Sequence, residues 1–238
     1  MNKEMIKLLA MCTMLLNHIA AVFLESETFL YEILTIIGYF TAITMCFFLV
    51  EGYRYTRSKK KYAFRLLLFG VISQIPFHLA LERGGETDFP HFNMMFTLFI
   101  CFLIICARKL IPNQDLGSNI AIGLTILTVL CDWAIFAPVF TQLFLWAEGS
   151  VKRQKQAYSF AAFGFGLYIF LTGIGKFSPI NNLFYALLAA GVIGVSAYCV
   201  LYCYNGKRSK RGRHFFQWFF YLFYPVHLFI LGILRFAH

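Results

Sequence analysis

Nine apolar runs, separated by short polar connections, constrain the fold of this chain more than any other feature. A helix needs roughly 20 apolar residues to cross about 30 Å of hydrocarbon, and most of these runs approach that length. Lipid offers no partner to the edge of an open sheet, and the runs lack the alternation of barrel strands, so we expect helices. The segments are residues 7–24, 33–53, 62–81, 92–111, 118–131, 136–146, 157–173, 183–204 and 215–236.

We therefore predict an all-α fold: a polytopic transmembrane helical bundle of about nine membrane segments that forms a single domain over residues 1–238. The fifth and sixth segments are short for full crossings. They are compatible with a hairpin that stops inside the membrane.

Composition agrees with an integral membrane protein. Of the 238 residues, 60% are hydrophobic and 13% are charged, whereas about a quarter of the residues of a soluble domain are charged. A soluble protein of this size cannot bury so much apolar surface. The composition excludes a soluble nucleic-acid-binding module, a disordered chain and a secreted disulfide scaffold. It predicts that the chain contacts the lipid bilayer.

The formal net charge of +10 is explained by the orientation of the helices. If the N-terminus is inside, 18 of the 21 Lys and Arg residues fall on the cytoplasmic side, and the exceptions are Arg83, Lys176 and Arg235. This distribution follows the positive-inside rule. It predicts a cytoplasmic N-terminus and an external C-terminus. The first run lacks a small-residue cleavage pattern, so we expect an uncleaved span.

The seven cysteines do not form a metal-binding pattern. Each lies inside or at the end of an apolar run. None belongs to a CxxC motif or to a Cys/His cluster with zinc spacing. We therefore expect no metal site.

Polar side chains inside the membrane are the main functional candidates, because each is costly there unless it is paired or faces water. If the helices pack as one bundle, one set falls in its outer half: Asn17, His18, Gln74, His78, Asn93, Asp132 and His227. Structural explanations exist as well. His78 and His227 each follow a proline by two residues, and an imidazole can satisfy the carbonyl that a proline leaves free. Asp132 can cap a helix, and His18 can bond a neighbouring helix.

A second set of charged residues lies at the inner ends of the second and third runs. Arg54, Arg57 and Arg65 carry planar guanidinium groups that suit phosphate, and Glu51 is placed to fix them. A histidine on the outer side with basic groups on the inner side suits transfer of a group from an anionic cytosolic donor. Histidine can serve as a general base or a transient acyl carrier near neutral pH.

Several stretches resemble the TraX family. Residues 7–19 contain Lys-Leu-Leu-Ala-Met and Met-Leu-Leu-Asn-His-Ile, and residues 48–57 read Phe-Leu-Val-Glu-Gly-Tyr-Arg-Tyr-Thr-Arg. The likeness continues through Ser-Gln-Ile-Pro-Phe at 73–77, through Asn93 with residues 96–98, and through the Asp-Trp pair at 132–133. It covers most of the first 150 residues, and the last three spans match loosely.

The resemblance implies an acyltransferase of the bacterial inner membrane that passes an acetyl group from cytosolic acetyl-CoA to an acceptor at the other face. The founding member acetylates the N-terminus of conjugative pilin. Family members carry an Asp where this chain has Asn17 and an Arg where it has Tyr39. We expect His18 to be the general base or acyl-accepting residue, with Asn17 orienting it or donating to the oxyanion. Asp132 would then supply the missing carboxylate.

Acetyl-CoA is thus the expected acyl donor, and its predicted contacts are Arg54, Arg57, Arg65 and Glu51. The predicted acceptor side is lined by Gln74, His78, Asn93 and His227. The acceptor stays open among a peptide N-terminus, a glycan and a lipid-linked cell-envelope unit. The rival interpretation is a transporter or a non-catalytic accessory subunit. A transporter of this kind is expected to contain repeats with broken spans in matching positions, and the sequence has no such symmetry.

Overall fold

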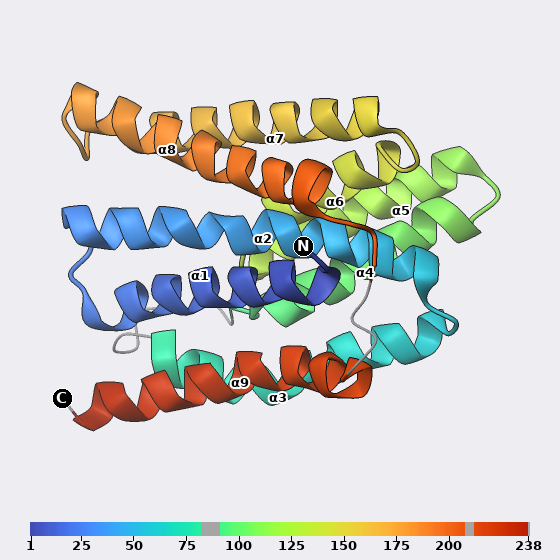
Figure 1. Cartoon of the computed structure of the whole chain (residues 1–238), viewed down its shortest axis with the longest axis horizontal. Coiled ribbons are helices and arrows are strands. Elements are labelled where there is room, and N and C mark those ends of the chain that lie inside the picture. The colour runs from blue at the N-terminus through green and yellow to red at the C-terminus, as the bar shows by residue number, and fades with distance from the viewer. Residues whose placement is uncertain (82–90, 208–211, 238) are drawn as a thin grey trace. The chain divides into compact units, whose positions relative to one another are not determined.

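The computed structural model describes residues 1–81, 91–207 and 212–237, without the side chains of Arg213 and His214. Arg83, one of the three exceptions to the charge distribution, lies outside this part. Within it, the regular elements are helices, and two isolated bridges are the nearest approach to strand pairing. The α-helices (Figure 1) are α1 (Lys3–Phe23), α2 (Phe29–Tyr55), α3 (Lys59–Leu81), α4 (Met94–Leu110), α5 (Gln114–Leu127), α6 (Phe136–Trp146), α7 (Val151–Thr172), α8 (Pro179–Tyr198) and α9 (Arg213–Ala237). A 3₁₀ turn, η1 (Thr128–Leu130), follows α5, and a π-helical turn, η2 (Cys199–Cys203), follows α8.

Every predicted segment contains a helix, and the all-helical membrane fold is confirmed. Within the described residues, five helices are long and apolar enough to cross a membrane: Lys3–Phe23, Phe29–Tyr55, Lys59–Leu81, Pro179–Cys203 and Phe215–Ala237. α5 with η1, and α6, are shorter apolar helices, as their sequence lengths predicted. Nine crossings therefore stay a prediction.

Several helices begin earlier than the apolar runs that predicted them. α1 begins at Lys3, where the Asn2 side chain accepts a hydrogen bond from the Met5 N–H at 2.9 Å. α8 begins at Pro179 behind a Ser178 cap. A search for apolar runs does not detect a polar first turn of a helix. The helix extends through such a turn because a cap satisfies its backbone N–H groups.

The chain forms two compact units. Unit 1 comprises Met1–Met45 and Ala147–Gln217, and unit 2 comprises Cys46–Trp146 and Trp218–His238. α2 and α9 therefore contribute residues to both units. The prediction of a single domain is neither supported nor contradicted by this division, and it stays a prediction.

Hydroxyl groups join the helices of unit 1. The Thr41 hydroxyl donates to the Ala10 carbonyl at 2.5 Å and lies 2.9 Å from the Thr13 hydroxyl, which ties α2 to α1. Thr44 and Ser196 share a hydrogen bond of 2.8 Å between α2 and α8. α7 and α8 lie side by side in an antiparallel pair (Figure 1). Small and hydroxyl-bearing residues are what helices need to associate where burial of apolar surface gives no driving force.

α4 is the central helix of unit 2 and packs against α3, α5 and α6. Two glycines allow close approach. A Cβ atom at Gly70 would lie 3.3 Å from the Phe96 ring, and one at Gly117 would lie 2.9 Å from the Ala107 carbonyl oxygen. These contacts fix the rotation of α4 and so decide which of its polar residues face α3.

α3 and α9 run parallel in unit 2. The Phe69 ring lies 6.3 Å from the Trp218 ring, and further along both helices Arg235 donates to the Ala80 carbonyl at 3.2 Å. Because residue numbers rise together along the contact, α3 and the part of α9 from Trp218 onward run in the same direction.

Candidate functional site

A hydrogen-bonded network centred on Gln74 joins α3 to the start of α4. The Gln74 amide nitrogen donates to the His91 carbonyl at 2.8 Å and lies 2.6 Å from His78 Nε2. Its amide oxygen accepts from the Asn93 side chain at 2.7 Å and from the Asn93 backbone at 3.3 Å. Asn93 also donates to the Gly70 carbonyl at 2.8 Å and caps α4. The structure thus brings together three residues predicted for the acceptor side.

This network constrains the chemistry of His78. A backbone carbonyl can only accept and a backbone N–H can only donate, so the bonds to His91 and Asn93 fix which end of the Gln74 amide is the nitrogen. The NH₂ group faces His78, and His78 Nε2 therefore accepts. A neutral His78 carries its proton on Nδ1 and has its Nε2 lone pair engaged. This favours a positioning role over that of a general base.

Asp132 lies in the connection between η1 and α6, beside the start of α4. The Asp132 N–H donates to the Phe92 carbonyl at 2.7 Å, and the Asp132 carbonyl accepts from the Thr97 hydroxyl at 2.5 Å. Burial raises the pKa of the Asp132 carboxyl to about 6, although the charge of His91 and a backbone hydrogen bond from Trp133 act in the opposite direction. A carboxyl with this pKa can exchange a proton near neutral pH, as a general base requires.

The connection that carries Asp132 is also strained. Trp133 has φ 57° and Ile135 has φ 63°, in the left-handed region that favours glycine. For a β-branched residue this conformation is costly, and strain of this kind gathers at functional sites. The Ile135 N–H donates to the Thr128 hydroxyl at 3.1 Å, which helps to hold the turn. No glycine marks this turn, so its left-handed backbone could not be predicted from residue types.

α9 contributes two buried polar groups to unit 2. The Tyr224 hydroxyl accepts from the Met94 N–H at 3.3 Å, at the N-terminus of α4. His227 Nδ1 lies 2.7 Å from the Phe223 carbonyl and must donate to it, and its ring stacks on Phe223 at 4.7 Å. A neutral His227 therefore has its lone pair on Nε2. Tyr224 was not predicted, because nothing in an aromatic-rich helix distinguishes it from its neighbours.

His18 and Asn17 belong to α1 in unit 1. His18 is buried, with 7% of its surface exposed. The Asn17 amide donates to the Thr35 carbonyl at 3.1 Å, and a Cβ atom at Gly38 would lie only 2.4 Å from the Asn17 Cβ. Asn17 thus holds α1 against α2. Its predicted action on His18, and the pairing of His18 with Asp132 of unit 2, stay predictions.

Replacing Gly38 with alanine should destabilise the protein by about 1–3 kcal/mol, because the new methyl group meets the Asn17 Cβ and the helices must separate. Thermal unfolding in detergent measures the effect. Gly191→Ala is the matched control, since a Cβ atom there has nothing within 4 Å. Equal melting temperatures of the two variants would contradict the close α1–α2 contact.

The predicted donor residues lie at the ends of α2 and α3 in unit 2. Arg54 and Arg57 are exposed, and the Arg54 guanidinium lies 5.5 Å from the centre of the Tyr55 ring. Arg65 is partly buried against two other tyrosine rings. Glu51 makes contacts of its own in the structure. The predicted anchoring of the arginines by Glu51 stays a prediction.

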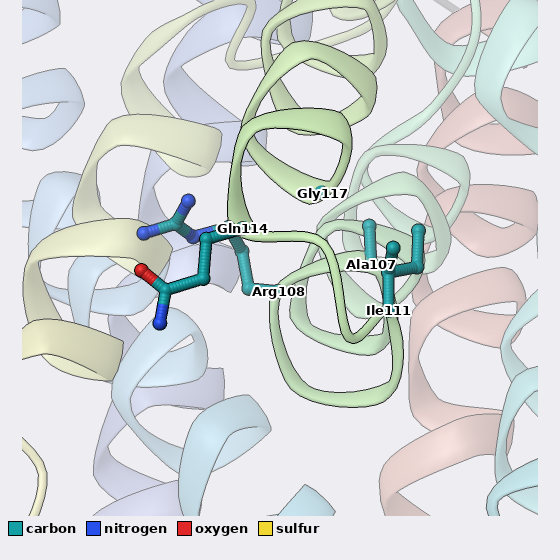
Figure 2. A pocket seen from close by; sticks show the side chains of 5 residues that line it. All are labelled: Ala107, Arg108, Ile111, Gln114 and Gly117. Carbon is teal, nitrogen blue, oxygen red and sulfur yellow. The ribbon is translucent and has the colours of Figure 1, made fainter.

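A cavity of about 160 Å³ lies at the turn between α4 and α5. Its lining residues (Figure 2) are Ala107, Arg108, Ile111, Gln114 and Gly117. Figure 2 shows the Arg108 and Gln114 side chains on one side of the turn, and Arg108 donates to the Ser118 hydroxyl. Sites for drug-sized ligands run from about 300 to 1,000 Å³, so this cavity is too small for a nucleotide-bearing donor.

Metal ligands do not gather anywhere in the described ranges, where no group of three or more His, Cys, Asp or Glu could hold an ion. The cysteines are free thiols. Cys46, for example, is fully buried and its thiol donates weakly to the Ala137 carbonyl at 3.5 Å. We interpret such thiols as packing groups.

Comparison with known proteins extends the resemblance seen in the motifs. The family model described as TraX protein matches residues 2–235. This chain belongs to the TraX family. A relative from Dichelobacter nodosus named "Probable fimbrial assembly protein FimC, serogroup H1" is 33% identical over 235 residues, which are 95% of this chain and 92% of the relative. No solved structure matches. TraX membership therefore spans the last three helices too, where the motifs alone matched loosely.

Proposed function

We propose that this TraX protein is an acyltransferase embedded in the bacterial inner membrane that transfers an acetyl group from cytosolic acetyl-CoA to an acceptor at the outer face. The acetyl carbonyl carbon leaves the thioester sulfur and bonds to an acceptor nitrogen or oxygen. A base takes the proton of the acceptor, and CoA leaves as the thiol. The observation that carries the proposal is the Gln74 network together with Asp132 in one compact unit. Helix packing alone does not require so many polar groups.

Each residue has a stated role in this proposal. His18 is the general base or carries the acetyl group, and Asn17 positions it. Asp132 supplies a carboxylate that is ionised near neutral pH. The acceptor binds near Gln74 and Asn93, whose mutual hydrogen bonds hold the start of α4 against α3.

The proposed topology has nine segments with a cytoplasmic N-terminus and an external C-terminus. The parallel arrangement of α3 and α9 in unit 2 supports it, because the third and the ninth of nine successive segments cross the membrane in the same direction. An outward-facing reaction centre with an inward-facing donor site follows from this orientation.

Reporter fusions test the topology. Fusions at Ser58 and Gly206 should report the cytoplasm, and those at Glu27 and Gly175 should report the outside, since basic connections are retained inside. Alkaline phosphatase and a cytoplasm-active fluorescent protein provide complementary signals. Opposite locations for Ser58 and Gly206 would contradict the arrangement.

The acceptor that we favour is a fimbrial protein. The D. nodosus relative is named as a fimbrial assembly protein and matches nearly the whole chain. A processed fimbrial subunit presents an N-terminal amine, and an amine is a good acyl acceptor once a base has removed its proton. Mass spectrometry of fimbriae from cells with and without this protein would reveal an acetyl group on the subunit.

Donor binding is the direct test of the enzymatic proposal. Arg54→Ala should weaken binding of acetyl-CoA by roughly 10- to 100-fold, because a charge-assisted hydrogen bond to phosphate contributes about 1.5–3 kcal/mol. Titration calorimetry of the purified protein at two salt concentrations measures the loss. Lys60→Ala, a change in the neighbouring basic run, should have a smaller effect. If the wild type fails to bind any CoA thioester, the donor assignment is wrong.

A second candidate function is a non-catalytic subunit of a fimbrial assembly machine. The name of the relative favours it as much as it favours an enzyme. Incubation of the purified protein with acetyl-CoA and a fimbrial peptide separates the two functions, because an enzyme releases CoA thiol in proportion to acetylated peptide and a structural subunit releases none.

A further inference from the structure

Arg65 occupies an unusual environment at the start of α3. Its guanidinium carbon lies 5.8 Å from the centre of the Tyr62 ring and 6.0 Å from that of Tyr221 on α9. Its Nε atom is buried and has no hydrogen-bond partner. Within residues 1–81, 91–207 and 212–237, no carboxylate pairs with this cation. The two rings therefore hold the guanidinium in place and leave its charge uncompensated.

The surface around Arg65 is apolar. On α3, Phe64 is 62% exposed and Leu68 is 39% exposed, and on α9, Trp218 is 48% exposed and Leu222 is 49% exposed. Both helices are candidate membrane spans, and they lie side by side in unit 2 (Figure 1). These side chains are thus placed to meet lipid acyl chains rather than water.

In the proposed topology, Arg65 lies near the cytoplasmic end of α3. It follows Lys59, the first residue of α3, by six positions, which is about 9 Å along a helix. Trp218 packs over Phe69 one turn away, and tryptophan and tyrosine rings commonly lie at this level of a bilayer. A guanidinium at this depth can reach the interface along its apolar stem.

We propose that Arg65, held between Tyr62 and Tyr221, binds the phosphate of an anionic phospholipid from the cytoplasmic leaflet, with Trp218 against its glycerol and upper acyl region. A guanidinium binds phosphate oxygens through two parallel N–H donors, and the cytoplasmic leaflet supplies anionic lipid. The phosphates of an acyl-CoA have the same chemistry. The exposed apolar side chains favour the lipid, because a soluble nucleotide gains nothing from them. This assignment replaces the donor contact predicted for Arg65 and leaves Arg54 and Arg57 at the donor.

Native mass spectrometry of the purified protein tests the site, with phosphatidylglycerol and phosphatidylcholine as probes. The wild type should retain phosphatidylglycerol in preference to phosphatidylcholine. Arg65→Gln should weaken that retention by roughly 10- to 100-fold, whereas Arg65→Lys, which keeps the charge but loses the fork, should weaken it less. Arg108→Gln is the matched control at an exposed arginine and should retain lipid as the wild type does.

Three results would overturn the proposal. They are equal retention by Arg65→Gln and the wild type, equal loss in Arg108→Gln, and displacement of phosphatidylglycerol by acetyl-CoA, which would assign Arg65 to the donor. If Arg65→Gln does not fold, the retention of phosphatidylglycerol by Arg65→Lys is compared with that of the wild type instead. The readout does not depend on acyl transfer, so it is separate from the test of enzymatic activity.

Discussion

His18→Ala is expected to lower the rate of acetyl transfer by about 10²- to 10⁴-fold if His18 is the general base, and by more if it carries the acetyl group. The imidazole is buried in α1, and the proposed reaction needs a group that exchanges a proton near neutral pH. Release of CoA thiol by the purified protein measures the rate. Binding of acetyl-CoA to the variant should stay within a few-fold of the wild type, which shows that the variant is folded.

Asn17→Asp is the companion variant. A carboxylate beside the imidazole stabilises its protonated form, so the pH optimum of transfer should move upward if His18 limits the rate. The structure adds a cost, because aspartate cannot donate to the Thr35 carbonyl as Asn17 does. We therefore expect lower stability together with the shifted optimum. Full activity of His18→Ala in a purified assay would remove His18 from the mechanism and leave Asp132 as the base.

Asp132→Asn is expected to reduce transfer by about 10²- to 10⁴-fold and to change its pH dependence. Burial raises the pKa of the Asp132 carboxyl to about 6, so in the wild type the ionised fraction rises from low to nearly complete between about pH 5 and pH 7. The rate should rise through the same interval. In Asp132→Asn the rise should disappear. A wild-type profile that is flat from pH 5 to pH 7 would contradict a need for an ionised carboxylate at this position.

Asp132→Asn should lower the rate of transfer but raise the stability of the folded protein. The pKa of Asp132 is raised from its ordinary value of 3.8, so folding favours the protonated carboxyl. Its stabilising contribution is complete below pH 3.8 and is lost as the pH rises through about 6. Asp132→Asn should therefore gain stability relative to the wild type between pH 4 and pH 8, by up to about 3 kcal/mol. Unfolding in detergent at both pH values measures the difference.

A double substitution tests whether His18 and Asp132 act together. Residues that serve one catalytic step are strongly non-additive, so His18→Ala combined with Asp132→Asn should be little slower than the worse single variant. Independent sites would multiply their losses.

Hydrophobicity and short motifs were enough to predict the helical membrane fold and the family. A long apolar run that crosses lipid must form a helix, because its backbone groups have no other hydrogen-bond partners there. Each segment could therefore be assigned from hydrophobicity alone. The same argument selected Gln74, His78 and Asn93, because polar residues at membrane depth need a partner. Boundaries were less well predicted, since capped first turns such as that of α1 are polar and escape an apolar pattern.

The partners of those residues depend on how the helices pack in three dimensions. The rotation of each helix depends on close contacts such as those at Gly38 and Gly70, and a sequence does not reveal which helices make them. Those contacts direct the Asn93 amide to Gln74 and the Asn17 amide to Thr35, so two similar asparagines serve a polar network and a helix junction respectively. Contacts between residues far apart in sequence arise from packing in three dimensions, and the pairing of Arg65 with Tyr221 is visible only there.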